Sequence, residues 1–339
     1  MNAIGVYVGG STETSTIEGI SIAGSSNKDT LYTPTLDLEY LVNGLPITKK
    51  EIPVTPEGLP TPAVITRSVL ENICIPFFVV DSGLFYKLKV PHILLPNAMP
   101  GSNIKGKNAL KYGTAKSIFY ESIKLGEIIS RNHDVVLIGE SIPGGTTTAS
   151  AIMEGLGYEA IDLVSSTSPN NPKELKRIVV KDALKRIKKE INDVFYIVDE
   201  VGDPVHIALA GIAFGSSKNS RIVLLSGGTQ MGAVISILTK LGLFNNKIKV
   251  ATTKWIINDK DSNIVSLLKQ INNVEIISSD LDFRDSKYDG LKLYEEGYVK
   301  EGVGAGGTLI LAKMLGFDNG QIKKFIYNEY ERLEKIGKN

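Results

Sequence analysis

Three copies of the tripeptide Gly-Gly-Thr, each opening an apolar run that ends in Leu-Gly, constrain this fold more than any other feature. The copies begin at Gly144, Gly227 and Gly306. Two of them follow the apolar stretches 135–138 and 222–225, which predicts a strand, a glycine turn and a helix in succession. Paired glycines let backbone N–H groups approach a ligand, and a helix start carries unsatisfied N–H donors, so this unit suits a phosphate. Three such units indicate a composite pocket for an anionic ligand.

The rest of the chain repeats the alternation of apolar strand and helix. We predict strands at 3–8, 77–80, 93–95, 135–138, 195–198, 222–225, 248–252 and 274–277. We predict helices at 66–73, 109–129, 147–156, 173–191, 231–241, 262–271, 308–315 and 320–336. Residues 11–62 are rich in Thr, Ser, Gly and Pro, which predicts loops and short helices.

Apolar strands that lack polar alternation and are separated by helices are typical of a parallel sheet covered on both faces. We therefore predict a doubly wound, mostly parallel α/β fold of the Rossmann type, with a smaller helical subdomain from the chain ends. Residues 1–75 would contribute a strand and part of the small subdomain, 76–300 the nucleotide-binding core, and 301–339 a glycine-rich loop and helices that complete the site. Ligands in such folds bind at the carboxyl ends of the strands, where the Gly-Gly-Thr turns fall.

Composition excludes several classes of function. The 38 basic and 37 acidic side chains nearly cancel, so no global field would attract nucleic acid or an anionic membrane. Cys74 is the only cysteine, which excludes an intrachain disulfide and a thiolate metal site. The amino terminus has no basic region typical of a signal peptide, and no apolar run is long enough to span a bilayer. We expect a cytoplasmic protein.

Familiar catalytic motifs are also missing. The three histidines, His92, His133 and His206, are scattered and have no serine or cysteine elbow nearby, which disfavours a Ser/His/Asp hydrolase. No lysine follows the glycine turns, so none of them is a Walker A loop. Residues 302–307 match G-x-G-x-x-G, but no strand precedes them, and we do not expect NAD binding.

Two glutamates flank the glycine turns and are candidate bases. Glu140 follows the predicted strand 135–138, and Glu301 precedes a segment with four glycines in six residues. At a strand end or helix start, the helix dipole is expected to keep a carboxylate ionised and therefore basic. A cap or an ion pair is the commoner use of an isolated glutamate. The glycines beside Glu301 favour a catalytic role, because they leave the carboxylate open to a ligand.

A basic run crowds the predicted helix 173–191, and most of its charges are expected to form a solvated face. Lys176 lies in the first turns of that helix, where it could neutralise a phosphate as a point charge. The spacing does not choose between Lys176 and Lys173.

Together these segments resemble the nicotinate-nucleotide–dimethylbenzimidazole phosphoribosyltransferase family, in particular its divergent archaeal relatives. Residues 139–148, Gly-Glu-Ser-Ile-Pro-Gly-Gly-Thr-Thr-Thr, are similar to the family's Gly-Glu-Met-Gly-Ile-Gly-Asn-Thr-Thr stretch. Residues 175–184 resemble its phosphate-binding lysine helix, and 300–305, Lys-Glu-Gly-Val-Gly-Ala, resemble its catalytic Gly-Glu-Gly-Thr-Gly-Ala segment. The resemblance covers about 75–315. The family's Lys-Pro-Pro-Gly-Ser-Leu-Gly segment is absent, and 58–63 stand in roughly its place, so the acceptor base stays open.

The resemblance implies transfer of 5-phosphoribose from nicotinate mononucleotide to a benzimidazole-like or other purine-like base, giving an α-ribotide for the lower ligand of cobamides. It implies a catalytic base at Glu301, no cofactor or metal, and a homodimer. The implied phosphate-binding residues are Gly144, Gly145, Thr146, Thr147 and Lys176. The implied ribose- and nucleotide-binding residues are Glu140, Gly227, Gly228, Thr229, Gln230, Gly302 and Gly304.

Two other functions compete with this interpretation. A metal-dependent phosphoribosyltransferase that uses the pyrophosphate donor has a hydrophobic strand, two acidic residues and a Thr-rich phosphate loop. Residues 195–200, ending in Asp199 and Glu200, begin in that way, but Asp203-Pro204 follow in place of the loop. A nucleotide-binding protein without turnover is the second alternative.

Overall fold

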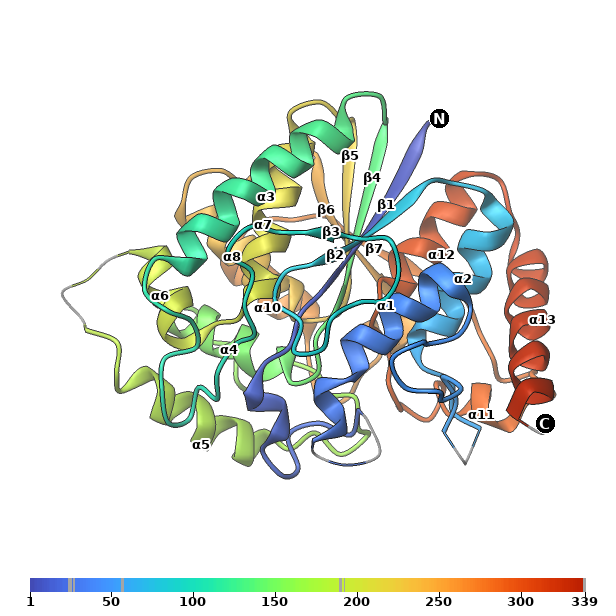
Figure 1. Cartoon of the computed structure of the whole chain (residues 1–339), viewed down its shortest axis with the longest axis horizontal. Helices are drawn as coiled ribbons and strands as arrows, with labels where there is room; N and C mark the ends of the chain where they lie inside the picture. Colours follow the sequence, from blue (N-terminus) through green and yellow to red (C-terminus); the bar gives the residue numbers. More distant parts are fainter. Residues whose placement is uncertain (24–25, 27, 56–57, 189–190, 192, 338–339) are drawn as a thin grey trace.

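The computed structural model describes residues 1–23, 26, 28–55, 58–188, 191 and 193–337. Its centre is a seven-stranded sheet in which every neighbouring pair is parallel, in the order β3-β2-β1-β4-β5-β6-β7 (Figure 1). The strands are β1 (Ala3–Gly9), β2 (Phe77–Asp81), β3 (Ile93–Leu94), β4 (Val135–Ser141), β5 (Ile222–Ser226), β6 (Ile248–Thr253) and β7 (Ile276–Ser279). The predicted doubly wound α/β fold is confirmed.

Helices cover both faces of this sheet. On one face lie α3 (Thr114–Ser130), α4 (Gly145–Gly155), α5 (Lys173–Leu184), α6 (Val194–Val201), α7 (Pro204–Ser217), α8 (Met231–Lys240) and α10 (Ile264–Ile271). On the other lie α1 (Thr33–Asn43), α2 (Pro62–Ile73), α12 (Ala305–Met314) and α13 (Asn319–Gly337), with the one-turn helices α9 (Lys254–Ile257) and α11 (Asp289–Lys292) nearby. No helix within the described residues is apolar over the length that a membrane crossing requires.

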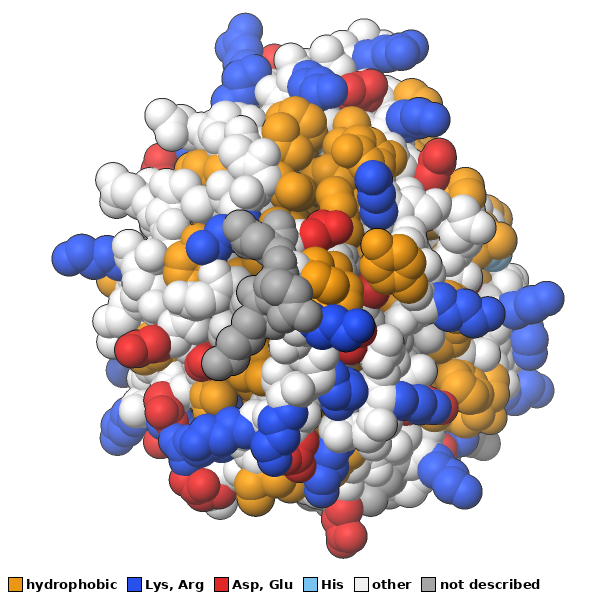
Figure 2. All heavy atoms as spheres, turned by 90° about the vertical axis from the view of Figure 1, so that its left-hand side faces the viewer, with side chains coloured by type: hydrophobic (Ala, Val, Ile, Leu, Met, Phe, Trp, Pro, Cys, Tyr) orange, Lys and Arg blue, Asp and Glu red, His pale blue; other side chains and the backbone are white. Residues whose placement is uncertain are grey.

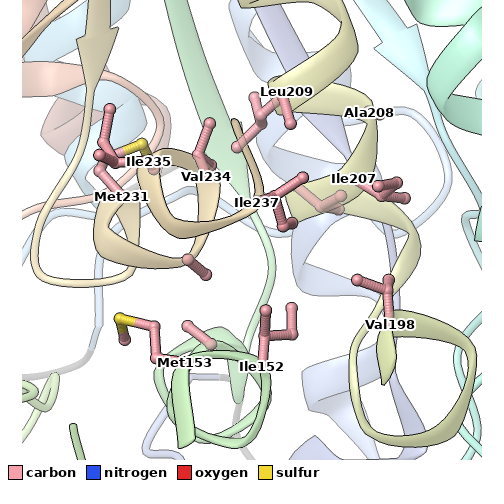
Figure 3. Packing of buried hydrophobic residues seen from close by; sticks show 14 of the residues in the cluster. Ile152, Met153, Val198, Ile207, Ala208, Leu209, Met231, Val234, Ile235 and Ile237 are labelled. Atoms are coloured by element: carbon pink, nitrogen blue, oxygen red, sulfur yellow. The ribbon is translucent and has the colours of Figure 1, made fainter. Parts of the chain in front are cut away.

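The core consists of two clusters, one on each face of the sheet, because successive side chains of a strand point to opposite faces. Val136 of β4 and Val223 of β5 belong to the cluster under α3, α7 and α8, whereas their neighbours Leu137 and Leu224 face α2 and α12. Figure 3 shows the first cluster, in which helices α4, α6, α7 and α8 meet through side chains such as Ile152, Val198, Ile207 and Val234. The second cluster joins the two ends of the chain, because α2 packs against both α12 and α13.

The predicted strand at 195–198 is wrong, because these residues form part of α6. Asp193 caps this helix by accepting from the Phe195 N–H at 2.9 Å, and the Phe195 ring packs 5.4 Å from that of Phe119. The period of a short apolar run does not distinguish a strand from a buried helix. The cap at Asp193 was the local signal that favoured a helix here.

Two further helices differ from the prediction. The basic helix ends at Leu184, earlier than predicted, and positions 189–190 of the predicted range lie outside the described residues. Helix α7 was not predicted, because it is buried on nearly every side and shows no amphipathic period. The pair Asp203-Pro204, a capping residue followed by proline at the first helical position, was its sequence signal.

The tightest helix contact is between α3 and α7, where Gly126 faces the backbone of α7. A Cβ on Gly126 would collide with the Ile212 carbonyl and lie 2.8 Å from the Ser216 nitrogen. We predict that Gly126→Ala lowers the free energy of unfolding by about 1–3 kcal/mol, because neither backbone atom can move aside. Guanidinium chloride unfolding would measure this, with Gly106→Ala as the control, since a Cβ at Gly106 meets nothing within 4 Å. Equal stability of the two variants would contradict the prediction.

Candidate active site

The strand order reverses between β1 and β4, so the chain leaves these neighbouring strands in opposite directions and opens a crevice at their carboxyl ends. Gly9 and Ser141 are paired at that edge. The loop after β4 then closes on the loop after β1, because a Cβ on Gly144 would lie 3.0 Å from the Cα of Ser15. Gly144 has a φ of 75°, which favours glycine, and α4 begins at the next residue. The first Gly-Gly-Thr turn therefore lies at the switch point.

The second turn, Gly227–Thr229, follows β5 and lies beside the first. A Cβ on Gly145 would collide with the Gln230 side chain, so the starts of α4 and α8 are in direct proximity. Thr229 Oγ1 accepts from the Ser165 N–H at 2.8 Å, which ties the turn to a serine-rich segment. Thr147, in the first turn of α4, is buried and its hydroxyl has no hydrogen-bond partner among the described residues.

The third Gly-Gly-Thr lies inside the first turn of α12 rather than before it, since that helix begins at Ala305. The loop that leads into α12 rests on the end of β4. The Val303 N–H donates to the Glu140 carbonyl at 2.8 Å, and a Cβ on Gly139 would lie 2.8 Å from the Cα of Gly304. This backbone approach brings the segment with Glu301 to Glu140, and Gly302 of the same loop packs near Pro62.

Glu140 is the penultimate residue of β4 and is buried, and the Gln230 amide donates to its Oε1. Burial raises the pKa of Glu140 well above its ordinary value, and the nearby charges of Glu301, Asp203 and Asp37 raise it further. Burial and these charges therefore favour the neutral form of the group. A neutral carboxyl group can donate a hydrogen bond as well as accept one.

Glu301 is held by the start of α12. Its carboxylate accepts from the Gly306 N–H at 3.1 and 3.2 Å and from the Gly302 N–H at 3.1 Å. Burial raises the pKa of Glu301 to about 7, although these amides act in the opposite direction. Burial therefore opposes, at both glutamates, the ionisation that was expected from the helix dipole. Glu301 as a whole residue is 9% exposed.

The backbone before Glu301 is strained. Val299 and Lys300 have φ values of 61° and 66°, and the N–H groups of Lys300 and Glu301 each donate two residues back, to Tyr298 and Val299. These are two consecutive γ-turns with positive φ, a rare arrangement that costs about 1–3 kcal/mol per residue. Outside contacts hold it in place, since the Val299 N–H donates to the Thr167 carbonyl at 2.7 Å. Strain of this kind gathers at functional sites.

Lys176 points inward from α5 and is fully buried. Its ammonium donates to the Ser165 carbonyl at 2.6 Å and to Asn171 Oδ1 at 3.0 Å. Burial lowers the pKa of Lys176 to about 7, and the charge of Lys300 adds to this effect. Lys173 is half-buried at the helix start, whereas Lys176 contacts Ser165, whose N–H donates to Thr229 of the second glycine turn. Lys181 of the same helix is exposed, and Figure 2 shows basic and acidic side chains interspersed over one face of the molecule.

Sequence analysis missed several polar residues at this edge of the sheet. Asp37, on α1, accepts from Ser141 Oγ at 2.7 Å, and burial raises its pKa to about 6. Asp203 caps α7 and accepts from His206 Nδ1 at 2.5 Å, whereas His206 Nε2 is buried without a partner among the described residues. The Asp-Pro helix start was a signal for Asp203. Asp37 had none, because α1 lies in the segment predicted as mostly loop.

Asp199 and Glu200 do not reach this site. Asp199 caps α3 by accepting from the Gly113 and Ala115 N–H groups at 2.6 and 2.8 Å, and Glu200 lies 3.8 Å from Arg186. Within the part of the chain that the structure describes, no cluster of three His, Cys, Asp or Glu side chains could hold a metal ion. A surface hollow of about 530 Å³ between Ser217 and Lys247 lies at the opposite end of the sheet, away from this chemistry.

The raised pKa of Glu301 predicts that the free energy of unfolding depends on pH. Its native carboxyl group binds a proton more tightly than in the unfolded chain, so its contribution is present at low pH and is lost as pH rises through about 7. From pH 5 to pH 8 the unfolding free energy of Glu301→Gln should gain about 1–3 kcal/mol relative to the parent. Denaturant unfolding at both pH values measures this, with the exposed Glu296→Gln as control. A pH-independent difference would contradict it.

Comparison with known proteins gives a consistent assignment. A family described as phosphoribosyltransferase matches residues 70–249, more than half of the 339 residues. A UPF0284 protein of Aeropyrum pernix is 49% identical over 96% of this chain and 91% of its own length. A UPF0284 protein of Pyrobaculum calidifontis is 44% identical over 98% of this chain and 96% of its own length.

The fold also matches a crystal structure of the nicotinate-nucleotide–dimethylbenzimidazole phosphoribosyltransferase from Thermus thermophilus. The TM-score is 0.65, with 15% identical residues over 96% of this chain and 83% of that one. The sequence motifs, the family match and the common fold agree. The chain therefore belongs to the nicotinate-nucleotide–dimethylbenzimidazole phosphoribosyltransferase family, among relatives that are archaeal UPF0284 proteins.

Proposed function

We propose that this protein transfers 5-phosphoribose from nicotinate mononucleotide to a benzimidazole-like or other purine-like base and releases an α-ribotide for the lower ligand of cobamides. Membership of the family supports the reaction class. The observation that carries the assignment is Glu301, a nearly buried carboxyl group with a pKa of about 7 at the start of α12. A pKa near the working pH is the value that suits a general base.

The reaction breaks the bond between C1 of the ribose and the pyridinium nitrogen of nicotinate. That nitrogen keeps the electron pair and becomes a neutral ring nitrogen, so no strong acid is needed. One nitrogen of the incoming base forms the new bond to C1, and its other ring nitrogen loses a proton. Ionised Glu301 accepts that proton.

The phosphate of the donor is assigned to the start of α4, around Gly144, Gly145, Thr146 and Thr147. A helix start carries a positive dipole end that attracts an anion. The Gly145 and Thr147 N–H groups donate to the Ile142 and Gly144 carbonyls in this structure. The buried hydroxyl of Thr147 is a further donor without a partner among the described residues. Lys176 adds the point charge.

The ribose is assigned to Glu140, near the end of β4. Neutral Glu140 can donate to a ribose hydroxyl while the Gln230 amide holds it in place. The turn Gly227–Thr229 and the glycines Gly302 and Gly304 would line the nucleotide side. Pro62 lies beside Gly302, so residues 58–63, which replace the family's missing segment, are the place to seek the acceptor pocket. The homodimer remains a prediction.

The role of Glu301 can be tested by Glu301→Gln, which keeps the shape of the side chain but removes the base. Turnover should fall by about 10²–10⁴-fold while the affinity for nicotinate mononucleotide is nearly unchanged. In the parent, kcat/KM should rise with pH up to about 7, and the variant should lack this limb because the titrating base is gone. Steady-state assays of nicotinate release measure both, with Glu296→Gln as control. Parent-like turnover of Glu301→Gln would transfer the role to Glu140.

Metal dependence separates this mechanism from that of a pyrophosphate-donor enzyme. A single phosphate can be neutralised by N–H groups and a lysine, whereas a pyrophosphate arrives with a metal ion. Asp199 caps α3 and Glu200 contacts Asn108, which leaves both carboxylates away from the glycine turns. We expect transfer from nicotinate mononucleotide to proceed in excess EDTA at nearly its rate with magnesium.

The same assay distinguishes the remaining alternatives. Loss of activity in EDTA, restored by magnesium and accompanied by pyrophosphate release from the other donor, would favour the metal-dependent mechanism. Binding of nicotinate mononucleotide without nicotinate release, with every candidate base tried, would favour a nucleotide-binding protein without turnover.

A further inference from the structure

Lys300 is a second buried lysine at this site, and none of the roles assigned above uses it. It directly precedes Glu301 and occupies the place where the resembling Gly-Glu-Gly-Thr-Gly-Ala segment has its first glycine. Its side chain is only 2% exposed, and its backbone has a φ of 66°, a conformation that glycine adopts at lower cost. A lysine that is buried and strained where glycine would fit suggests that its ammonium is needed there.

The ammonium groups of Lys300 and Lys176 reach one short segment from two different elements. Lys176 Nζ, from α5, donates to the Ser165 carbonyl at 2.6 Å. Lys300 Nζ, from the loop before α12, donates to the Ser168 carbonyl at 3.2 Å and the Gly297 carbonyl at 3.0 Å. Both ammonium groups therefore contact the segment 165–168, and its first residue also contacts the second Gly-Gly-Thr turn through Thr229.

The carboxylate of Asp259 lies beside this lysine pair. Asp259 Oδ2 lies 3.6 Å from Lys300 Nζ, which is an ion pair but too long for a hydrogen bond. The charges of Asp261 and Lys173 also act on the pair. Burial lowers the pKa of both lysines.

We propose that Lys300 is a second cation of the phosphate subsite, so that Lys176 and Lys300 together bind the phosphate of the donor as a dianion. The identity of the donor rests on the proposed function, but the anion subsite does not. Carbonyl oxygens hold the two ammonium groups in this structure, and a phosphate accepts from them more strongly because it is charged. The lysine before the catalytic glutamate thereby ties phosphate binding to the loop that carries the base.

The test is calorimetric titration of Lys300→Met, which keeps the apolar stem and removes the charge. The ligands are nicotinate mononucleotide, ribose 5-phosphate, and nicotinate riboside, which lacks the phosphate. We expect the two phosphorylated ligands to bind about 10- to 100-fold more weakly and the riboside to bind within about twofold of the parent. Lys292→Met, a surface lysine paired with Asp289, is the matched control and should bind all three like the parent.

Each outcome decides the proposal. Unchanged affinity for the phosphorylated ligands, or an equal loss for the riboside, would overturn it, because the lysine would then be structural. Lys300→Gln is measured beside Lys300→Met, with circular dichroism as a check on folding, and loss of folding in both variants would likewise assign a structural role. If ribose 5-phosphate binding depends on Lys300 but no nicotinate is released with any base, the proposed function fails and the anion subsite stands.

Discussion

The contact between the carboxyl group of Glu301 and the first N–H groups of α12 organises this end of the molecule. It anchors the strained loop 299–304, and that loop in turn lies on the end of β4 through the Val303 N–H and the Glu140 carbonyl. The approach depends on glycine at both Gly139 and Gly304, because a Cβ at either position would collide with the other backbone. The two glutamates are brought together by backbone contacts, and side-chain attraction plays no part.

Burial then sets the chemistry of these groups. In water both glutamates would be ionised at neutral pH, but loss of hydration raises the pKa of each, and their mutual repulsion separates them. Glu301, whose ionised form is stabilised by the Gly302 and Gly306 amides, has a pKa of about 7. Burial and the nearby carboxylates favour the neutral form of Glu140. The site therefore holds one group suited to accepting a proton and another that burial favours as a hydrogen-bond donor.

Much of this arrangement was predictable from the sequence. The apolar runs at β1, β4, β5 and β6 predicted the parallel sheet, because buried parallel strands lack alternation. The Gly-Gly-Thr turns predicted where a ligand would bind. The prediction of a strand at 195–198 was wrong because an apolar run of this length is equally compatible with a buried helix. Helix α7 was missed because a helix that is buried on all sides has no polar face. The pKa of Glu301 could not be predicted, since burial depends on contacts between segments far apart in the chain.

Burial shifts the pKa of the lysines in the opposite direction to that of the glutamates. Burial disfavours their charged form, so Lys176 has a pKa of about 7 and is only partly charged at neutral pH before an anion binds. A bound phosphate dianion would favour the charged form and raise that pKa again. Binding and protonation of the lysine therefore reinforce each other, whereas Glu301 must lose its proton to act as a base. Partial neutralisation of these groups limits the electrostatic penalty of burying them when the chain folds. In the proposed site, a bound phosphate would restore the positive charge of the lysines.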